Sequence, residues 1–164
     1  MRSVSRRRHA GRRSRSTSGD ATARVSLARP RYGSPRMATI DDAARMALDL
    51  DGASEGVRYG HRAWSVDGKV FAWERPYSKA DLRRFGDATP PSQPVVAVTV
   101  EDLDVKEAML AQETPGFFTI SHFDGYPAVL IELTRVGDET LRDALLEAWL
   151  VCAPTRLSDR YREP

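Results

Sequence analysis

The sequence is poor in cysteine and has no long apolar run, and both shortages exclude classes of protein. Cys152 is the only cysteine among 164 residues, so a framework of intrachain disulfides is impossible. No apolar run approaches the roughly 18 residues that a membrane-spanning helix needs, which excludes an integral helical membrane protein. The chain is long enough to bury a core, and we expect a cytoplasmic protein that does not contact membranes.

Signatures of metal, phosphate-loop and dinucleotide binding are missing as well. The three histidines and the cysteine do not have the spacing of metal ligands, and no glycine-rich phosphate-binding motif occurs. His122 and Asp124 form a pair of a kind that can tune a general base, but no Ser or Cys in a nucleophile motif accompanies them. The simpler interpretation is a turn in which both side chains bond the backbone. We therefore expect no metal, no cofactor and no enzymatic activity.

The charge is divided unevenly along the chain. Residues 1–36 hold eleven Arg, seven Ser and one acid, Asp20, for a net charge of +10, whereas residues 37–164 carry −8. A segment with so few apolar side chains cannot offset its ordering entropy, so we expect residues 1–36 to be disordered. Three interpretations of this tail stay open: a nucleic-acid-binding arm, an organellar transit peptide, or a mis-assigned start that makes Met37 the true one.

Helical periodicity predicts three helices in the remaining chain. The first follows Thr39, a good N-cap residue, and ends at Gly52. The last is capped by Asp138 and closed by Pro154. The middle helix covers residues 102–112, and its spacing predicts an inward face made of Val105, Ala108, Met109 and Gln112.

A tight hairpin is predicted around Asp67-Gly68, which separates two short alternating segments, residues 62–66 and 69–74. In the register that a two-residue turn imposes, Trp64 faces Phe71. Trp73 then lies on the same face as both, and the simplest role for these aromatic residues is the core.

Three further strands are expected at residues 95–100, 117–121 and 128–134. The polar stretch from Pro76 to Pro94 is expected to be a long connection. Because the strands cluster without regular alternation with helices, the predicted class is α+β with an antiparallel sheet.

Three blocks of sequence carry a resemblance to a known family. They are Glu55–Trp64 continuing through Val66–Ala72, then Phe117–Thr119 with His122–Ile131, then Leu141–Trp149 with Ala153–Leu157. Across essentially all of residues 38–158 the chain resembles the MmcQ/YjbR family. The resemblance implies a single-domain α/β sandwich, a curved antiparallel sheet of about five strands with helices packed on it. Residues 37–158 would form this domain and residues 159–164 a C-terminal tail.

The same resemblance implies a function, because the family is usually described as DNA-binding through two β-hairpin wings and has no associated catalytic activity. Here the chain departs from the family pattern: Ser65, Asp67 and Thr155 stand where basic residues are common. Each departure removes a positive charge from a place where a phosphate contact is expected.

Two functions therefore stay open. DNA binding through phosphate contacts, with low sequence specificity, would use Arg62, Lys69, Arg156 and, in the tail, Arg6, Arg7, Arg8, Arg12 and Arg13. Alternatively, the chain is a module for a protein or small ligand, using Tyr59, Trp64, His122 and Tyr126. Arg156 has a second possible role in bonding the carbonyls at the end of the last helix. We expect a monomer or a weak dimer.

Overall fold

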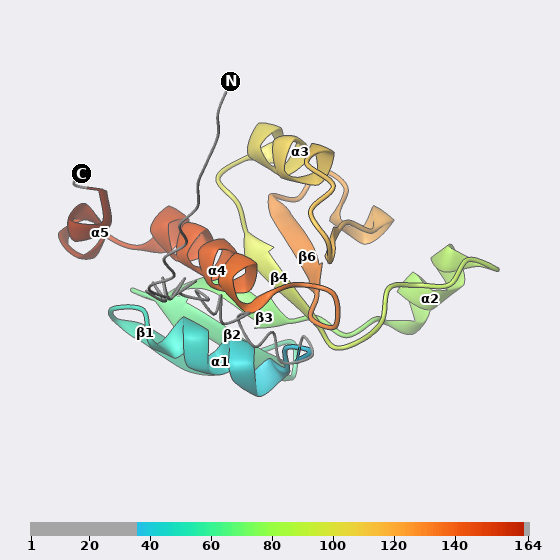
Figure 1. Ribbon diagram of the computed structural model, residues 1–164, viewed down its shortest axis with the longest axis horizontal. Helices are drawn as coiled ribbons and strands as arrows, with labels where there is room; N and C mark the ends of the chain where they lie inside the picture. Colours follow the sequence, from blue (N-terminus) through green and yellow to red (C-terminus); the bar gives the residue numbers. More distant parts are fainter. Residues whose placement is uncertain (1–35, 163–164) are drawn as a thin grey trace, which may run out of the picture. The chain divides into compact units, whose positions relative to one another are not determined.

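The computed structural model describes residues 36–162 (Figure 1). Within that range, six strands form one antiparallel sheet in the order β1-β2-β3-β4-β6-β5. The strands are β1 (Ala53–Arg58), β2 (His61–Val66), β3 (Lys69–Glu74), β4 (Val95–Thr99), β5 (Phe117–Phe118) and β6 (Ala128–Glu132). The helices are α1 (Ile40–Leu48), α2 (Lys79–Phe85), α3 (Leu103–Ala111), α4 (Asp138–Cys152) and α5 (Thr155–Arg162), with a 3-10 turn η1 (Ser121–Phe123).

This curved sheet with packed helices confirms the predicted α+β class and its single-domain architecture. The predicted disorder of the N-terminal tail, and its arginines Arg6, Arg7, Arg8, Arg12 and Arg13, lie outside the described residues. None of the helices in residues 36–162 combines the length and the apolar character that crossing a membrane requires.

The two faces of the sheet are covered differently. Helices α1 and α4 pack on one face and bury the larger cluster of apolar side chains, including Trp64, Phe71 and Trp149 (Figure 1). The opposite face carries a smaller cluster that contains Trp73 and Phe123, with Tyr77 packed at its margin. Among residues 36–162, the helix packed beside this cluster is the short α2, through Phe85, and the loop around η1 contributes Ile120 and Phe123. This second face bears the candidate site.

A β-bulge overturns the predicted register of the β2–β3 hairpin. The turn itself is as predicted, because Asp67 and Gly68 both have positive φ and Val66 pairs with Lys69. The register then shifts, so that Trp64 pairs with Ala72 and not with Phe71. The extra residue sends Trp73 to the opposite face from Trp64, whereas the sequence predicted one shared face.

Three elements were not predicted: strand β1, helix α2 and helix α5. Helix α2 lies inside the expected connection and begins with a capping box, in which Ser78 and Asp81 bond each other's backbone N–H groups. Helix α5 follows Pro154, where the chain was expected to leave the helical part.

Two helix details also differ from the predictions. Helix α3 buries Lys106, while Ala108 and Gln112 are exposed although they were expected on the inward face. The N-cap of α4 is Gly137, so Asp138 is the first helical residue and not the cap. Its carboxylate interacts favourably with the positive end of the helix dipole. At α1 the predicted cap is confirmed, because the Thr39 side chain accepts a hydrogen bond from Asp42 N.

Candidate functional site

A pocket of about 560 Å³ opens on the second face of the sheet. The turn between β1 and β2, the end of β3 and the loop around η1 surround it. Its lining combines five aromatic side chains, two arginines and two histidines, and it contains no Asp or Glu. The lining residues are Arg58, Tyr59, His61, Trp73, Arg75, Pro76, Tyr77, Ser78, His122, Phe123 and Tyr126.

Arg58 is the central cation of this pocket. Its Cζ lies 4.4 Å from the centroid of the Trp73 ring and 5.3 Å from that of Tyr59. One Nη2 hydrogen bond goes to the Tyr126 hydroxyl, at 3.2 Å. No ion pair within residues 36–162 includes Arg58. A half-buried guanidinium thus lies over an indole ring with no carboxylate partner among the described residues.

Two backbone features place Arg58 on Trp73. Tyr59 and Gly60 both have positive φ, 51° and 80°, which produces a two-residue turn and pairs Arg58 directly with His61 across the hairpin. Directly paired residues point to the same face of a sheet, so both side chains reach the pocket. The bulge in the next hairpin turns Trp73 to that same face.

Arg75 is the second arginine of the lining, and its charge is already matched. Its Nη2 donates to Asp81 Oδ2 at 2.9 Å, and its Cζ lies 5.4 Å from the centroid of Phe123. Burial would raise the pKa of Asp81, but hydrogen bonds from Ser78 and Arg75 outweigh it and lower that pKa. Arg75 therefore helps to build the wall, whereas Arg58 is left to meet a ligand.

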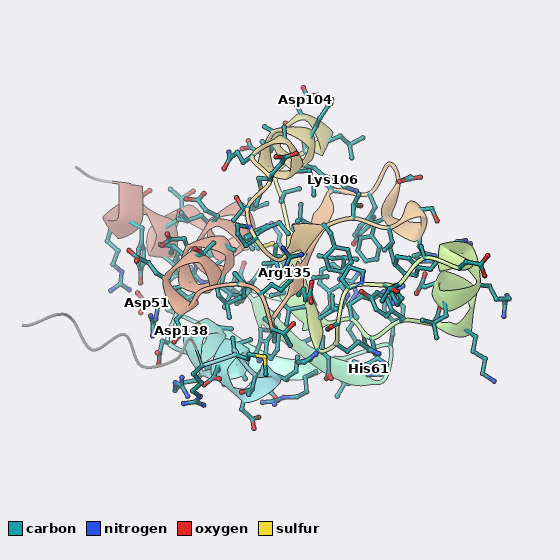
Figure 2. All side chains as sticks on the ribbon, turned by 45° about the vertical axis from the view of Figure 1, so that its right-hand side comes forward. Asp51, His61, Asp104, Lys106, Arg135 and Asp138 are labelled. Atoms are coloured by element: carbon teal, nitrogen blue, oxygen red, sulfur yellow. The ribbon has the colours of Figure 1, made fainter. Side chains whose placement is uncertain are left out.

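A buried lysine, Lys106 of α3, anchors the loop that carries His122 and Tyr126; Figure 2 labels this residue. The Lys106 ammonium on α3 donates to the carbonyl oxygens of Phe123 at 2.5 Å and Tyr126 at 3.0 Å. Burial lowers the pKa of Lys106. The Phe123 ring stacks beside Trp73 and meets Tyr126 edge to face. The loop is consequently a fixed wall of the pocket.

Tyr77 forms another part of the lining. Its hydroxyl donates to the Pro91 carbonyl oxygen at 3.0 Å, and its ring meets Phe85 edge to face. Burial, together with the nearby carboxylates of Glu132 and Asp81, raises the pKa of Tyr77 to about 12. The phenol therefore stays neutral at physiological pH and offers an apolar ring to the pocket.

The structure brings together three of the residues named for a ligand site. Tyr59, His122 and Tyr126 all line the pocket, although they come from different elements. Trp64 does not reach it: the side chain is fully buried on the other face, and its Nε1 donates to Glu55 Oε2 at 3.0 Å.

Arg62, Lys69 and Arg156, the described residues among those named for phosphate contacts, lie outside the pocket lining, and both arginines are paired with acids. Arg62 donates to Glu55 at 2.8 Å and to Asp41 at 2.7 Å, and its bond to Glu55 lowers the pKa of that carboxyl. Arg156 pairs at 3.1 Å with Asp67, which lies in the β2–β3 turn. Lys69 is exposed, and no ion pair within the described residues includes it.

Eight lining residues were not named as site residues by the sequence analysis: Arg58, His61, Trp73, Arg75, Pro76, Tyr77, Ser78 and Phe123. The turn that positions Arg58 contains Gly60, a residue typical of turns. Trp73 had no such signal, because its face depends on the bulge. Within residues 36–162, no three His, Cys, Asp or Glu side chains gather as a metal ion would require.

Comparison with known proteins places this site in a family context. A family model described as YjbR matches residues 48–151, which include the whole pocket lining. The chain belongs to the YjbR family. Two proteins described as uncharacterized, Rv2570 of Mycobacterium tuberculosis and Mb2600 of Mycobacterium bovis, are each 44% identical to this YjbR-family chain over 128 residues. Each match covers 76% of this chain and 96% of the mycobacterial protein. No solved structure matches.

Proposed function

We propose that the protein is a non-enzymatic binding protein whose pocket takes a small organic anion with a flat apolar body. The carrying observation is the Arg58 guanidinium, which lies on Trp73 with no acidic partner among the described residues. A planar guanidinium held on an aromatic ring is well suited to bind a carboxylate or phosphate with two parallel hydrogen bonds.

The rest of the lining supports the same ligand chemistry. The pocket volume of about 560 Å³ falls within the range of small-molecule sites, which are mostly apolar with a few convergent polar groups. Aromatic side chains supply the apolar surface, and no Asp or Glu side chain lines the pocket to contact an anion directly. The combination favours an anion over a cation or a neutral sugar.

A matched pair of ligands tests this proposal. Naphthoate and its neutral amide have the same ring and similar size, and their binding to the full chain can be compared by isothermal titration calorimetry. We expect naphthoate to bind at least about tenfold more tightly, because a hydrogen bond to an ionised partner is stronger than one between neutral groups. Equal affinities for the two compounds, or no binding of any organic anion, would contradict the proposal.

DNA binding with low sequence specificity is the second candidate function. Lys69 favours it, since this exposed lysine follows the turn of the β2–β3 hairpin and none of the ion pairs in the described part of the chain includes it. Tyr59, 83% exposed at the turn of the β1–β2 hairpin, offers a ring on which a base can stack. Pairing of Arg62 and Arg156 with acids weakens this candidate.

Salt dependence distinguishes the sources of any DNA affinity. DNA binding would be measured at about 50 and about 200 mM salt for the wild type, for Lys69→Gln, and for a full chain with Gln at Arg6, Arg7, Arg8, Arg12 and Arg13. Binding through the hairpins predicts that Lys69→Gln lowers the salt slope by about one. If only the tail variant loses affinity, the hairpins are not the contact.

Location and assembly are part of the proposal. We propose a cytoplasmic protein that is a monomer or a weak dimer, with the single cysteine, Cys152, buried and free as support for a reducing compartment. Light scattering after size exclusion over a concentration series tests the assembly. A tight dimer at the lowest concentration would contradict it.

A further inference from the structure

We infer that the organic anion is a phosphate monoester carried by an aromatic base, which is the chemistry of a nucleotide. This inference rests on the proposed function and names the ligand class of the same pocket. It depends on the number of cationic donors around Arg58, on the size of the pocket and on its open mouth.

The number of nitrogen donors favours phosphate over carboxylate. Arg58 and His61 are direct partners across the β1–β2 hairpin, so their side chains lie on the same face of the sheet. His122 reaches the same lining from η1, with its ring 6.0 Å from that of Phe123. A phosphate monoester carries up to two negative charges and three acceptor oxygens, whereas a carboxylate carries one charge and two oxygens. Three cationic or protonatable side chains from separate elements match the phosphate.

The size and walls of the pocket favour an aromatic base on that phosphate. Inorganic phosphate alone would leave most of the 560 Å³ empty, because volumes in this range hold drug-sized ligands. Tyr59 and Tyr77 add ring surface from two different segments of the lining. Stacking of a base on such rings stabilises binding without selecting one base, as in proteins that bind single strands.

The open mouth of the pocket allows two sources of this nucleotide. Tyr59 and Tyr126 at the mouth are 83% and 41% exposed, so a bound nucleotide would not be fully enclosed. The ligand can therefore be a free mononucleotide or the phosphorylated end of a single DNA strand. The chemistry that the pocket recognises is the same for both.

Calorimetry on the full chain tests the inference, with AMP, adenosine and inorganic phosphate as probes. We expect AMP to bind at least about tenfold more tightly than either adenosine or phosphate, because it makes both the ionic and the stacking contacts. Arg58→Gln should lower the affinity for AMP at least about tenfold and change the affinity for adenosine by less than about twofold. Arg62→Gln is the matched control, since this arginine of the same hairpin is paired with acids outside the pocket and its loss should not alter AMP binding.

A double variant, His61→Gln with His122→Gln, separates this inference from the proposed function. This variant should lower the affinity for AMP at least about fivefold and change the affinity for naphthoate by less than about twofold. Arg58 alone can supply the hydrogen bonds that a carboxylate accepts. Binding of naphthoate without binding of AMP would overturn the nucleotide inference and keep the proposed function. If no organic anion binds, both the nucleotide inference and the proposed function are overturned. A thermal unfolding curve shows whether each variant is folded.

Two single-stranded oligonucleotides that differ only in a phosphate at one end show whether the ligand is a free nucleotide or the end of a DNA strand. If the pocket takes a strand end, the phosphorylated oligonucleotide binds at least about tenfold more tightly than the unphosphorylated one, and Arg58→Gln removes the difference. If the pocket takes free nucleotides, AMP binds and the two oligonucleotides do not differ. A DNA affinity that ignores both the phosphate and Arg58, with no binding of AMP, contradicts the inference.

Discussion

Single polar side chains keep the pocket in shape, and Lys106 is the clearest case. A buried ammonium that bonds two loop carbonyls fixes the wall on which His122 and Tyr126 stand. Removing it would leave each carbonyl oxygen only its backbone donor, Tyr126 N for Phe123 and Ala128 N for Tyr126, and the loss of two charge-assisted hydrogen bonds is more costly than removing an exposed charge.

Lys106→Met should lower the free energy of unfolding by about 1–3 kcal/mol and weaken ligand binding, since the loop loses its anchor. Chemical denaturation and calorimetry measure the two effects. Lys79→Met, at an exposed position of α2, is the control. If both variants are as stable as the wild type and bind equally well, Lys106 does not position the loop.

Asp42 produces a pH dependence that is independent of the pocket. Hydrogen bonds from Thr39, with help from Arg45 and Arg36, lower the pKa of Asp42 from 3.8 to about 2. The ionised form therefore stabilises the fold above pH 3.8, and this contribution is lost as the pH falls toward about 2. In Asp42→Asn the melting temperature should change less over that interval than in the wild type. An unchanged slope would contradict this account, and Asp49→Asn at the other end of α1 is the control.

At the scale of elements, the turns were easier to predict from sequence than the register of the strands. Asp67-Gly68 identified its hairpin because this pair readily adopts two positive φ angles. The bulge that follows has no such marker, so Trp73 was predicted on the wrong face. Helix α2 was missed although Ser78 and Asp81 have the spacing of a capping box.

The candidate site shows the same division. Tyr59, His122 and Tyr126 could be named from the sequence because they are aromatic or titratable residues in two of the blocks that carry the family resemblance. Arg58 and Trp73 could not be paired in advance, since their contact needs both a correct hairpin and the bulge. The sequence thus predicted the loop residues of the pocket, whereas the contact between Arg58 and Trp73 is seen only in the tertiary structure.

Two glycines separate backbone strain from steric conflict. Gly116 and Gly60 both have positive φ, 90° and 80°, but only at Gly116 would a Cβ lie 2.9 Å from a backbone oxygen, that of Glu132. Gly60→Ala should therefore lower the free energy of unfolding by about 1–2 kcal/mol, and Gly116→Ala by clearly more. If urea denaturation gives the same loss of unfolding free energy for both variants, the backbone of β6 moves away from the new methyl group without a measurable loss of stability.

On the scale of the whole molecule, the two arginines of the β1–β2 hairpin, Arg62 and Arg58, lie on different faces of the sheet. Arg62 is paired with acids beside α1, while Arg58 is in the pocket on the second face. The three tryptophans are probes of the two faces of the sheet. Trp64 and Trp149 belong to the cluster under α1 and α4, and Trp73 lies beneath Arg58.

The most direct test of the account follows the three indole N–H signals by ¹H–¹⁵N NMR while naphthoate is added to the full chain. Tryptophan-to-phenylalanine variants assign the signals. We predict that the Trp73 signal shifts with ligand concentration, that those of Trp64 and Trp149 stay in place, and that Arg58→Gln abolishes the shift. A titration that moves the Trp64 signal and leaves Trp73 unchanged would contradict the pocket as the binding site.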